Sequence, residues 1–261
     1  MGNSCCNDQG DDQEVLKSAQ KKEDMTPNMQ ENDKIVYIHN GSNAQSTNLL
    51  DPDIQNFDKE PNTYFNLNSE ILKSIDKHGF YQCYGGNNKL PYKKYEGSAP
   101  DGRQFKYFGQ MDGKKMEGKG QLQFIEKNGE FVVCTFRNGR AEGGGAIYFP
   151  NGDYFKGKLQ DNLMKEGTLL LSNGSKYEGK FIENMYDGQG AFAFLDGRKY
   201  KGDFKKGQKN GQGTINWING SSYTGEWKNG HQHGHGKFID TKGVSHEGEF
   251  ADGKMLKSKA K

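Results

Sequence analysis

A repeat of 23 residues constrains the fold of this chain more than any other feature of its sequence. Tyr177, Tyr200, Tyr223 and His246 follow one another at this interval. Each begins a motif with Gly at its third position and Phe or Trp at its fifth, and a Gly-x-Gly motif follows the first three. A fixed period of this length indicates a repeat architecture, in which small units stack on their neighbours. We therefore expect an array of repeats rather than one central core.

The repeat frame continues toward the N-terminus in weaker form. Earlier units begin at Tyr107, Val132 and Phe155. Cys134 replaces the first glycine of the second of these units, and the Phe155 unit is one residue short in its turn. Together the motifs predict six full units and a seventh half unit over residues 105–253.

Each unit has the pattern of two strands joined by a turn. Apolar residues and glycines alternate with Lys, Glu, Asp and Gln, and a period of two is the strand signal. Several units end on Asn-Gly or Asp-Gly, which favours a type I′ turn because both central residues need a positive φ. These pairs are Asn151-Gly152, Asn173-Gly174, Asp196-Gly197 and Asn219-Gly220. The apolar positions should share one sheet face, with the charged residues facing water.

The glycines inside the strands need a separate explanation, because glycine normally weakens a strand. Here they recur at fixed positions between aromatic residues. A bare backbone lets an aromatic ring from a neighbouring strand lie flat over it, and glycine also permits the tight twist of a β-ribbon. We therefore interpret the Gly-x-Gly steps as hairpin positions and not as a nucleotide-binding loop.

The unit from Tyr177-Glu-Gly-Lys-Phe181 to Gly188-x-Gly190 resembles the MORN repeat (membrane occupation and recognition nexus). The resemblance covers residues 105–253. It implies an all-β fold, an elongated single-layer antiparallel β-meander of tandem MORN hairpins with one hairpin per repeat. MORN repeats accompany lipid kinase or methyltransferase domains in some proteins, but the remaining polar residues of this chain are too few for either enzyme.

The sequence before the array predicts a largely disordered region with one short helix. Residues 1–68 are rich in Asn, Gln, Asp and Lys and hold too few apolar residues to fold alone. A helix is expected at residues 69–78, where Ser69 caps the start and Gly79 ends it. The chain therefore divides into a tether (1–68), a helix and lead-in (69–104), the repeat array (105–253) and a basic tail (254–261).

The first six residues carry the clearest functional signal. Met1-Gly2-Asn3-Ser4-Cys5-Cys6 resembles an N-myristoylation site at Gly2 followed by palmitoylation sites at Cys5 and Cys6, although Cys6 replaces the usual Ser or Thr. One myristoyl chain binds membranes only marginally, and a second acyl chain makes the attachment stable. We therefore predict that acyl chains hold the protein at the cytoplasmic face of a membrane, either the plasma membrane or a ciliary or cortical membrane.

Charge is divided unevenly along the chain. The first 80 residues contain seven Lys and fourteen Asp or Glu, a net charge of −7. Because the whole chain carries +2, the remainder carries +9. A basic body is attracted to anionic surfaces, so direct binding of acidic phospholipid is one alternative function. A structural role in a cilium or in the cortical cytoskeleton, as in radial-spoke MORN proteins, is another.

No motif in the sequence indicates catalysis, and we expect a non-enzymatic protein without cofactor, metal or nucleic acid. His231, His233 and His235 alternate, which is compatible with metal binding, but they occupy turn and hairpin positions of the sixth unit. The four cysteines form no framework of spaced pairs, which favours a reducing, intracellular compartment.

The aromatic face of the array is the predicted partner site. A single-layer sheet should not bury this face completely, and large exposed apolar surfaces usually bind something. We expect a protein partner, such as a helix lying in an aromatic groove, or the chain's own helix (69–78) or short apolar segment (35–38) folding back into it. The groove residues are Tyr177, Phe181, Phe192, Tyr200, Phe204, Trp217, Tyr223 and Trp227. The sequence thus predicts a scaffold that holds a protein partner at a membrane surface.

Overall fold

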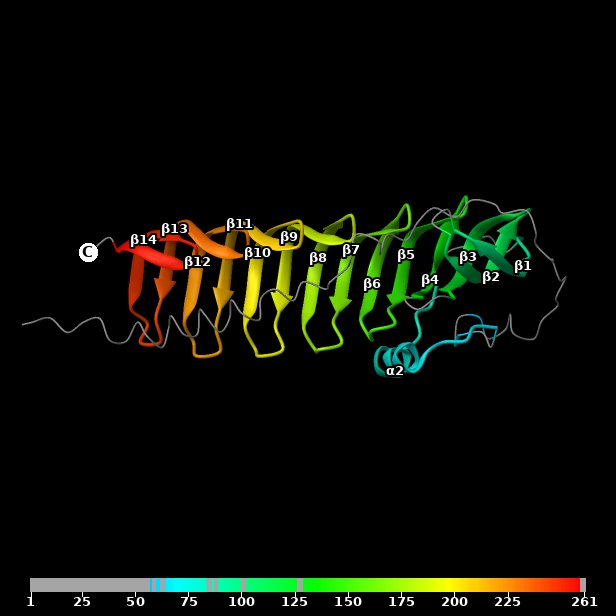
Figure 1. Cartoon of the computed structure of the whole chain (residues 1–261), viewed down its shortest axis with the longest axis horizontal. Coiled ribbons are helices and arrows are strands. Elements are labelled where there is room, and N and C mark those ends of the chain that lie inside the picture. Colours follow the sequence, from blue (N-terminus) through cyan, green and yellow to red (C-terminus); the bar gives the residue numbers. More distant parts are fainter. Residues whose placement is uncertain are drawn as a thin grey trace, which may run out of the picture. The chain divides into compact units, whose positions relative to one another are not determined.

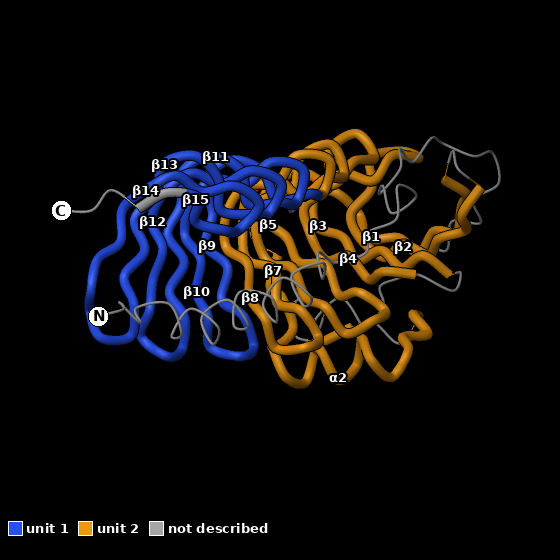
Figure 2. Tube along the Cα trace, turned by 60° about the vertical axis from the view of Figure 1, so that its left-hand side comes forward, with its two compact units in different colours: residues 1–32, 185–261 blue, residues 33–184 orange. Residues whose placement is uncertain are grey.

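The structure is a computed structural model that describes residues 57, 60–61, 64–83, 86, 89–99, 102–125 and 129–258. It divides into two compact units (Figure 2). Unit 2 comprises residues 33–184, and unit 1 comprises residues 1–32 and 185–261. In the described part of the chain, unit 2 holds one helix and the first eight strands, and unit 1 holds the last seven strands.

Strands make up most of both units, and their order in the sheet is their order in the chain (Figure 1). The strands of unit 2 are β1 (Tyr92–Ser98), β2 (Gln104–Asp112), β3 (Lys115–Phe124), β4 (Phe131–Arg137), β5 (Arg140–Tyr148), β6 (Tyr154–Gln160), β7 (Leu163–Leu170) and β8 (Lys176–Ile182). Those of unit 1 are β9 (Met185–Ala193), β10 (Lys199–Lys205), β11 (Gln208–Asn216), β12 (Ser222–Lys228), β13 (His231–Ile239), β14 (Ser245–Ala251) and β15 (Lys254–Ser258).

Within each unit, every strand pairs antiparallel with the next one. The predicted all-β antiparallel meander is therefore confirmed. The sheet also reaches beyond the predicted array, because β1 precedes it and β15 occupies the start of the predicted basic tail.

The predicted helix is present as α2 (Ser69–His78). Its N-cap is Asn68 rather than Ser69, since the Asn68 side chain accepts a hydrogen bond from the Ile71 N–H at 2.8 Å. Gly79 ends the helix with φ +81, a conformation that glycine adopts readily because it has no Cβ.

The second glycine of several Gly-x-Gly steps, Gly120, Gly213 and Gly236, makes room for a tyrosine ring. In β10, the Tyr200 hydroxyl donates to the carbonyl oxygen of Asp203 at 3.0 Å, which lays the ring along its own strand. The ring covers Gly213 of β11, where an added Cβ would overlap the hydroxyl oxygen and two ring carbons of Tyr200. In the same way, each of three other tyrosine hydroxyls donates to the carbonyl oxygen of the residue three positions later: Tyr107, Tyr177 and Tyr223.

The first glycine of the step has a different role. Gly211 lies at an irregularity in the β10–β11 pairing and has φ +109, a region that side chains rarely adopt. The bulge leaves the Gln212 N–H without a strand partner, and the Asp203 carboxylate accepts it at 2.7 Å. Two glycines two residues apart thus serve a bulge and a ring contact.

The turns fall into two classes, and the predicted assignment is wrong for one of them. Lys206-Gly207 and Asn229-Gly230 are type I′ turns with positive φ at both residues. At Asn219-Gly220, only the glycine has a positive φ, and Asn219 Oδ1 accepts the Ser221 N–H at 3.0 Å. This side-chain hydrogen bond favours a type I turn with a glycine bulge. The same correction applies to Asn151-Gly152, Asn173-Gly174 and Asp196-Gly197.

The second face of the sheet differs from the prediction in unit 2. Charged residues were expected there, but β4 to β6 place Phe131, Tyr148 and Tyr154 in register on this face. Phe108 and Val133 extend the same apolar area, which we call the covered face. Residues 57, 60–61 and 64–83, which we call the covering segment, pack against it. Unit 2 therefore has apolar cores on both sheet faces.

Candidate functional site

The eight predicted groove residues are buried rather than open. Their side chains are between 0% and 7% exposed. The argument that one sheet layer cannot bury its own aromatic face is therefore wrong for these residues. Glycine contributes to this burial, because the Tyr200 and Tyr223 rings lie against bare backbone at Gly213 and Gly236, where a side chain would otherwise stand.

The rings of unit 1 form a continuous series of edge-to-face contacts. Tyr200 contacts Phe204 on its own strand and Trp227 on β12, with centroid distances of 5.1 and 5.2 Å. Tyr223 repeats the arrangement, contacting Trp227 at 5.4 Å and Phe250 at 4.8 Å. Edge-to-face geometry at this spacing is favourable beyond the area that it buries. On this face, the aromatic rings of one repeat therefore pack against those of the next repeat.

The tyrosine hydroxyls on this face act as hydrogen-bond donors and not as acids. Burial raises the pKa of Tyr107, Tyr200 and Tyr223 above the usual value of a phenol. The hydroxyls therefore stay protonated at physiological pH and keep donating to their main-chain carbonyls. Gly213 and Gly236 are partly exposed on the same face, so a partner lying across it meets backbone as well as ring edges.

This face also holds a buried cation that the repeat pattern does not predict. Lys209 is only 6% exposed, and its Nζ lies 4.3 Å from the ring centroid of Trp227 and 5.7 Å from that of Tyr200. An ammonium over an indole face is attracted by the ring quadrupole. The signal in the sequence is a single Lys at a frame position that Met116, Met164 and Gln232 occupy in other units.

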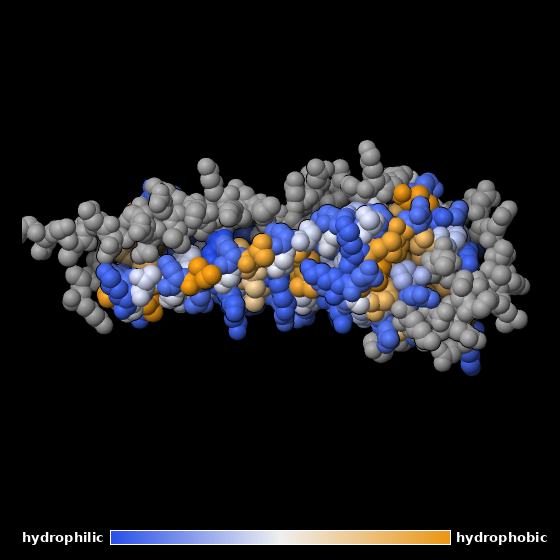
Figure 3. Space-filling view, turned by 90° about the horizontal axis from the view of Figure 1, so that it is seen from below, coloured by the Kyte–Doolittle hydropathy of each residue, from blue (hydrophilic) through white to orange (hydrophobic). Residues whose placement is uncertain are grey.

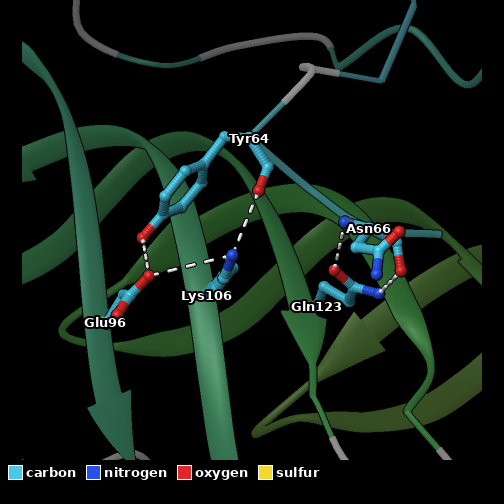
Figure 4. Close-up of polar contacts among 5 residues, drawn as sticks. All are labelled: Tyr64, Asn66, Glu96, Lys106 and Gln123. Atoms are coloured by element: carbon cyan, nitrogen blue, oxygen red, sulfur yellow. Dashed lines mark hydrogen bonds and ion pairs between the residues drawn. The ribbon is translucent and has the colours of Figure 1, made fainter.

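The covered face of unit 2 holds the covering segment through its main chain (Figure 4). Gln123 of β3 accepts the Asn66 N–H at 3.1 Å and donates to the Asn66 carbonyl at 2.8 Å. Lys106 of β2 donates to the Tyr64 carbonyl at 3.4 Å, and the Tyr64 hydroxyl donates to Glu96 at 2.9 Å. A side-chain amide that pairs with both main-chain groups of one residue imitates the edge of a strand.

Further main-chain contacts fix both ends of the covering segment. Gln121, 0% exposed, donates to the Phe57 carbonyl at 2.9 Å. The Tyr148 hydroxyl donates to the Gly79 carbonyl and accepts the Tyr81 N–H, both at 2.9 Å. The two ends of the segment are therefore tied to β3 and β5.

Aromatic side chains anchor the covering segment between these polar contacts. The Phe57 ring lies 5.5 Å from Phe108, and the Phe65 ring lies 5.2 Å from Phe131. The His78 imidazole stacks on Tyr154 with a centroid distance of 5.0 Å and an interplanar angle of 5°. The helix packs mainly through Ile71, which is 0% exposed.

The other predicted functional residues are placed as follows. Gly2, Cys5 and Cys6 lie outside the described residues. The three alternating histidines lie at the start of β13, and His235 Nε2 is 3.0 Å from a Glu249 carboxylate oxygen. In the described part of the chain, no group of three or more His, Cys, Asp and Glu side chains is positioned to bind a metal ion. The side chains of Cys83 and Cys134 are buried.

None of the described helical residues forms a helix with the length and apolar character that crossing a membrane requires.

Comparison with known proteins supports the repeat assignment. The family model of the MORN repeat matches five segments, residues 107–126, 135–154, 177–197, 200–222 and 223–245. The Phe155 unit is not matched, yet β6 and β7 pair in the register of the other units, with Phe155 opposite Leu169. No curated protein matches the chain. MORN repeats generally take part in membrane or protein interactions, and proteins that carry them are generally structural or adaptor proteins rather than enzymes.

Proposed function

We propose that this protein is a non-enzymatic scaffold that holds a protein partner at the cytoplasmic face of a membrane. The observation that carries the proposal is the tandem array of five matched MORN repeats behind a Met-Gly-x-x-Cys-Cys N-terminus. In this proposal Gly2, Cys5 and Cys6 carry acyl chains, and two kinds of acyl chain give stable membrane attachment.

We propose that the partner lies along the repeat face of unit 1, which is the sheet face that carries the repeated aromatic residues and the in-strand glycines. Six of the buried aromatic residues shape this face, Phe192, Tyr200, Phe204, Trp217, Tyr223 and Trp227. The partly exposed rings of Phe194 and Phe238 and the partly exposed backbone at Gly213 would contact the partner. A helix suits such a surface, because its apolar side chains recur on one face at intervals of about one turn and would contact successive rings. The covering segment does not compete for this site, since it occupies the second face of unit 2.

The membrane part of the proposal is tested by localisation. We would express the full chain and a Gly2→Ala, Cys5→Ser, Cys6→Ser variant in cells, and label both with an alkyne analogue of myristate. The proposal predicts label and membrane enrichment for the wild type only. Equal localisation of both proteins at a cilium or cortical filament would instead support the cytoskeletal alternative.

The partner part is tested separately by proximity labelling. Phe194→Ser and Phe238→Ser alter partly exposed rings, so they should leave the fold intact; Ile182→Ser, at an exposed position before the β8–β9 turn, is the matched control. The proposal predicts a protein neighbour that both groove variants lose and the control keeps. Identical neighbours for all four proteins, with unchanged thermal unfolding, would refute the groove.

A further inference from the structure

Large exposed apolar side chains gather on one set of loops. The described residues contain seven of them, and four lie on loops that join an odd-numbered strand to the next even-numbered one. One of these four, Ile125 in the β3–β4 loop of unit 2, is 51% exposed. The other three, in unit 1, are Leu195, Ile218 and Val244, which are 70%, 80% and 51% exposed. Single exposed apolar residues are ordinary, but Leu195 and Ile218 recur at the same loop position, two residues before a glycine, and Val244 follows the glycine of the next loop.

The loops that carry Leu195 and Ile218 satisfy their own backbone. Around Leu195, the Phe194 N–H donates to the Arg198 carbonyl and the Gly197 N–H to the Phe194 carbonyl, at 2.9 and 3.0 Å. The β11–β12 loop repeats both hydrogen bonds around Ile218. Because these groups are already paired, moving the loops from water into an apolar medium leaves few polar groups without partners.

The three loops of unit 1 form a line. They connect successive hairpins, and two strand spacings separate neighbouring loops by about 10 Å. A Cβ added at Gly197 would lie 3.3 Å from Ile218 Cδ1, so the first two loops touch. These loops run along the lower margin of the sheet in Figure 1, and Figure 3 views that side, where apolar groups alternate with hydrophilic ones.

The acidic side chains Asp196 and Asp240 on these loops each have a partner in the same loop or on the strand that follows it. The Arg198 guanidinium is 2.9 Å from the Asp196 carboxylate and lies over the Phe194 ring at 4.4 Å. Asp240 pairs with His246 at 3.2 Å. No excess of positive charge marks these loops, so electrostatic attraction to anionic headgroups is not their chemistry. Their chemistry is the presentation of separate apolar tips in a row.

We propose that the loop tips of unit 1 at Leu195, Ile218 and Val244 insert into the interfacial region of a lipid bilayer. Polar residues separate the tips, so they offer no continuous patch of the kind that buries a protein partner. A row of isolated tips on rigid, self-paired loops fits a flat and deformable apolar surface instead. The inference rests on the proposed membrane location and adds a second attachment, which would hold unit 1 with its loop edge toward the bilayer.

The test is vesicle flotation of the full-length Gly2→Ala, Cys5→Ser, Cys6→Ser protein, which removes the acyl anchor. We would use vesicles of phosphatidylcholine alone and vesicles with added phosphatidylserine. The proposal predicts binding to both, with a bound fraction that changes less than twofold between low and high salt. Adding Leu195→Ser and Ile218→Ser should lower the bound fraction at least fivefold, whereas adding Ile182→Ser should not change it.

Two results would overturn the inference. One is absence of binding of the unacylated protein to either vesicle. The other is binding that needs phosphatidylserine, falls with salt and is unaffected by the loop substitutions, which would point to the basic surface. Thermal unfolding of all variants controls for folding. Neither result bears on acylation, which the cellular localisation experiment tests independently.

Discussion

Unit 2 and unit 1 build the same repeat face but use the opposite face of the sheet differently. In unit 2, Phe131, Tyr148 and Tyr154 follow one another across strands on that opposite face, and the covering segment packs on them. In unit 1, Lys199, Asn216 and Ser222 form the corresponding cross-strand row. The repeat motif therefore specifies only one face, because its aromatic residues and glycines alternate with positions that it leaves open. Unit 2 uses these positions to fasten a segment of its own chain.

The largest expected effect is that of Phe131→Ala. Phe131 is 0% exposed and contacts Phe65, Phe80 and Tyr148. The substitution removes a ring from the centre of the covered face, which should cost unit 2 about 3–5 kcal/mol of unfolding free energy. Urea denaturation followed by circular dichroism would measure this loss. Tryptophan fluorescence should shift less, since Trp217 and Trp227 both lie in unit 1.

The matched control is Ser222→Ala in the equivalent row of unit 1. Ser222 is partly exposed among polar neighbours, so its substitution should change the unfolding free energy by no more than about 0.5 kcal/mol. A loss as large as that of Phe131→Ala would show that the two second faces do not differ in energy, and the comparison would fail.

A smaller effect, similar in the two units, is expected on the repeat face that each unit has. Gly120→Ala and Gly213→Ala each place a Cβ against the ring of the preceding tyrosine, Tyr107 or Tyr200. Overpacking of this kind should cost about 1–3 kcal/mol at each site. Circular dichroism would follow Gly120→Ala, and tryptophan fluorescence Gly213→Ala. Destabilisation at only one of the two sites would contradict a common role for this glycine.

Gln123→Ala tests the main-chain contacts of the covering segment. It removes two hydrogen bonds to Asn66, each with a net contribution of about 0.5–1.5 kcal/mol. Because Asn66 is exposed, water can replace part of the loss, and we expect about 1–2 kcal/mol in total. Limited proteolysis at residues 64–67 would measure the release. Unchanged cleavage would mean that the aromatic anchors alone hold the segment.

The smallest effect is a pH dependence from His78. Desolvation by burial, helped by nearby Lys77, lowers the pKa of His78 below its usual value of 6.5. The unfolded chain therefore binds a proton more readily, so stability is full above pH 6.5 and falls as the pH drops through and below that value. Urea midpoints of unit 2 at pH 7.5 and 5.5, compared with His78→Phe, would reveal it. An identical pH dependence in the variant would exclude His78 as the cause.

The sequence predicted the repeat face and the helix but not the covered face. The 23-residue spacing placed Tyr177, Tyr200 and Tyr223 in equivalent strands, and α2 has the predicted bounds. A usable signal for the covered face was present at Phe131-Val-Val133, where consecutive apolar residues replace alternation, as in a strand buried on both faces. The identity of the covering segment could not follow from a periodic pattern, because its anchors Phe57, Phe65 and Ile71 are irregularly spaced and its polar contacts are made largely by its main-chain atoms.

The observed aromatic face and turns also differ from the predicted ones, because their packing and side-chain hydrogen bonds are not visible in a residue pattern. The groove prediction rests on a single layer leaving its rings open, but these rings are buried, and at Gly213 the missing side chain leaves the space that the Tyr200 ring fills. The turn assignment took Asn-Gly as type I′, whereas the Asn219 side chain pairs with the backbone and selects another turn. Membrane attachment through Gly2, Cys5 and Cys6 stays a prediction.

Hydrogen exchange of the full chain, read by mass spectrometry, tests the difference between the two units most directly. In the wild-type protein, the amides of residues 69–83 should be protected together with β4 and β5. In Phe131→Ala, both regions should lose protection, while β10 to β13 keep theirs. Exchange of residues 69–83 at the rate of an unfolded chain in the wild type, or an equal loss of protection in β10 to β13, would contradict the account.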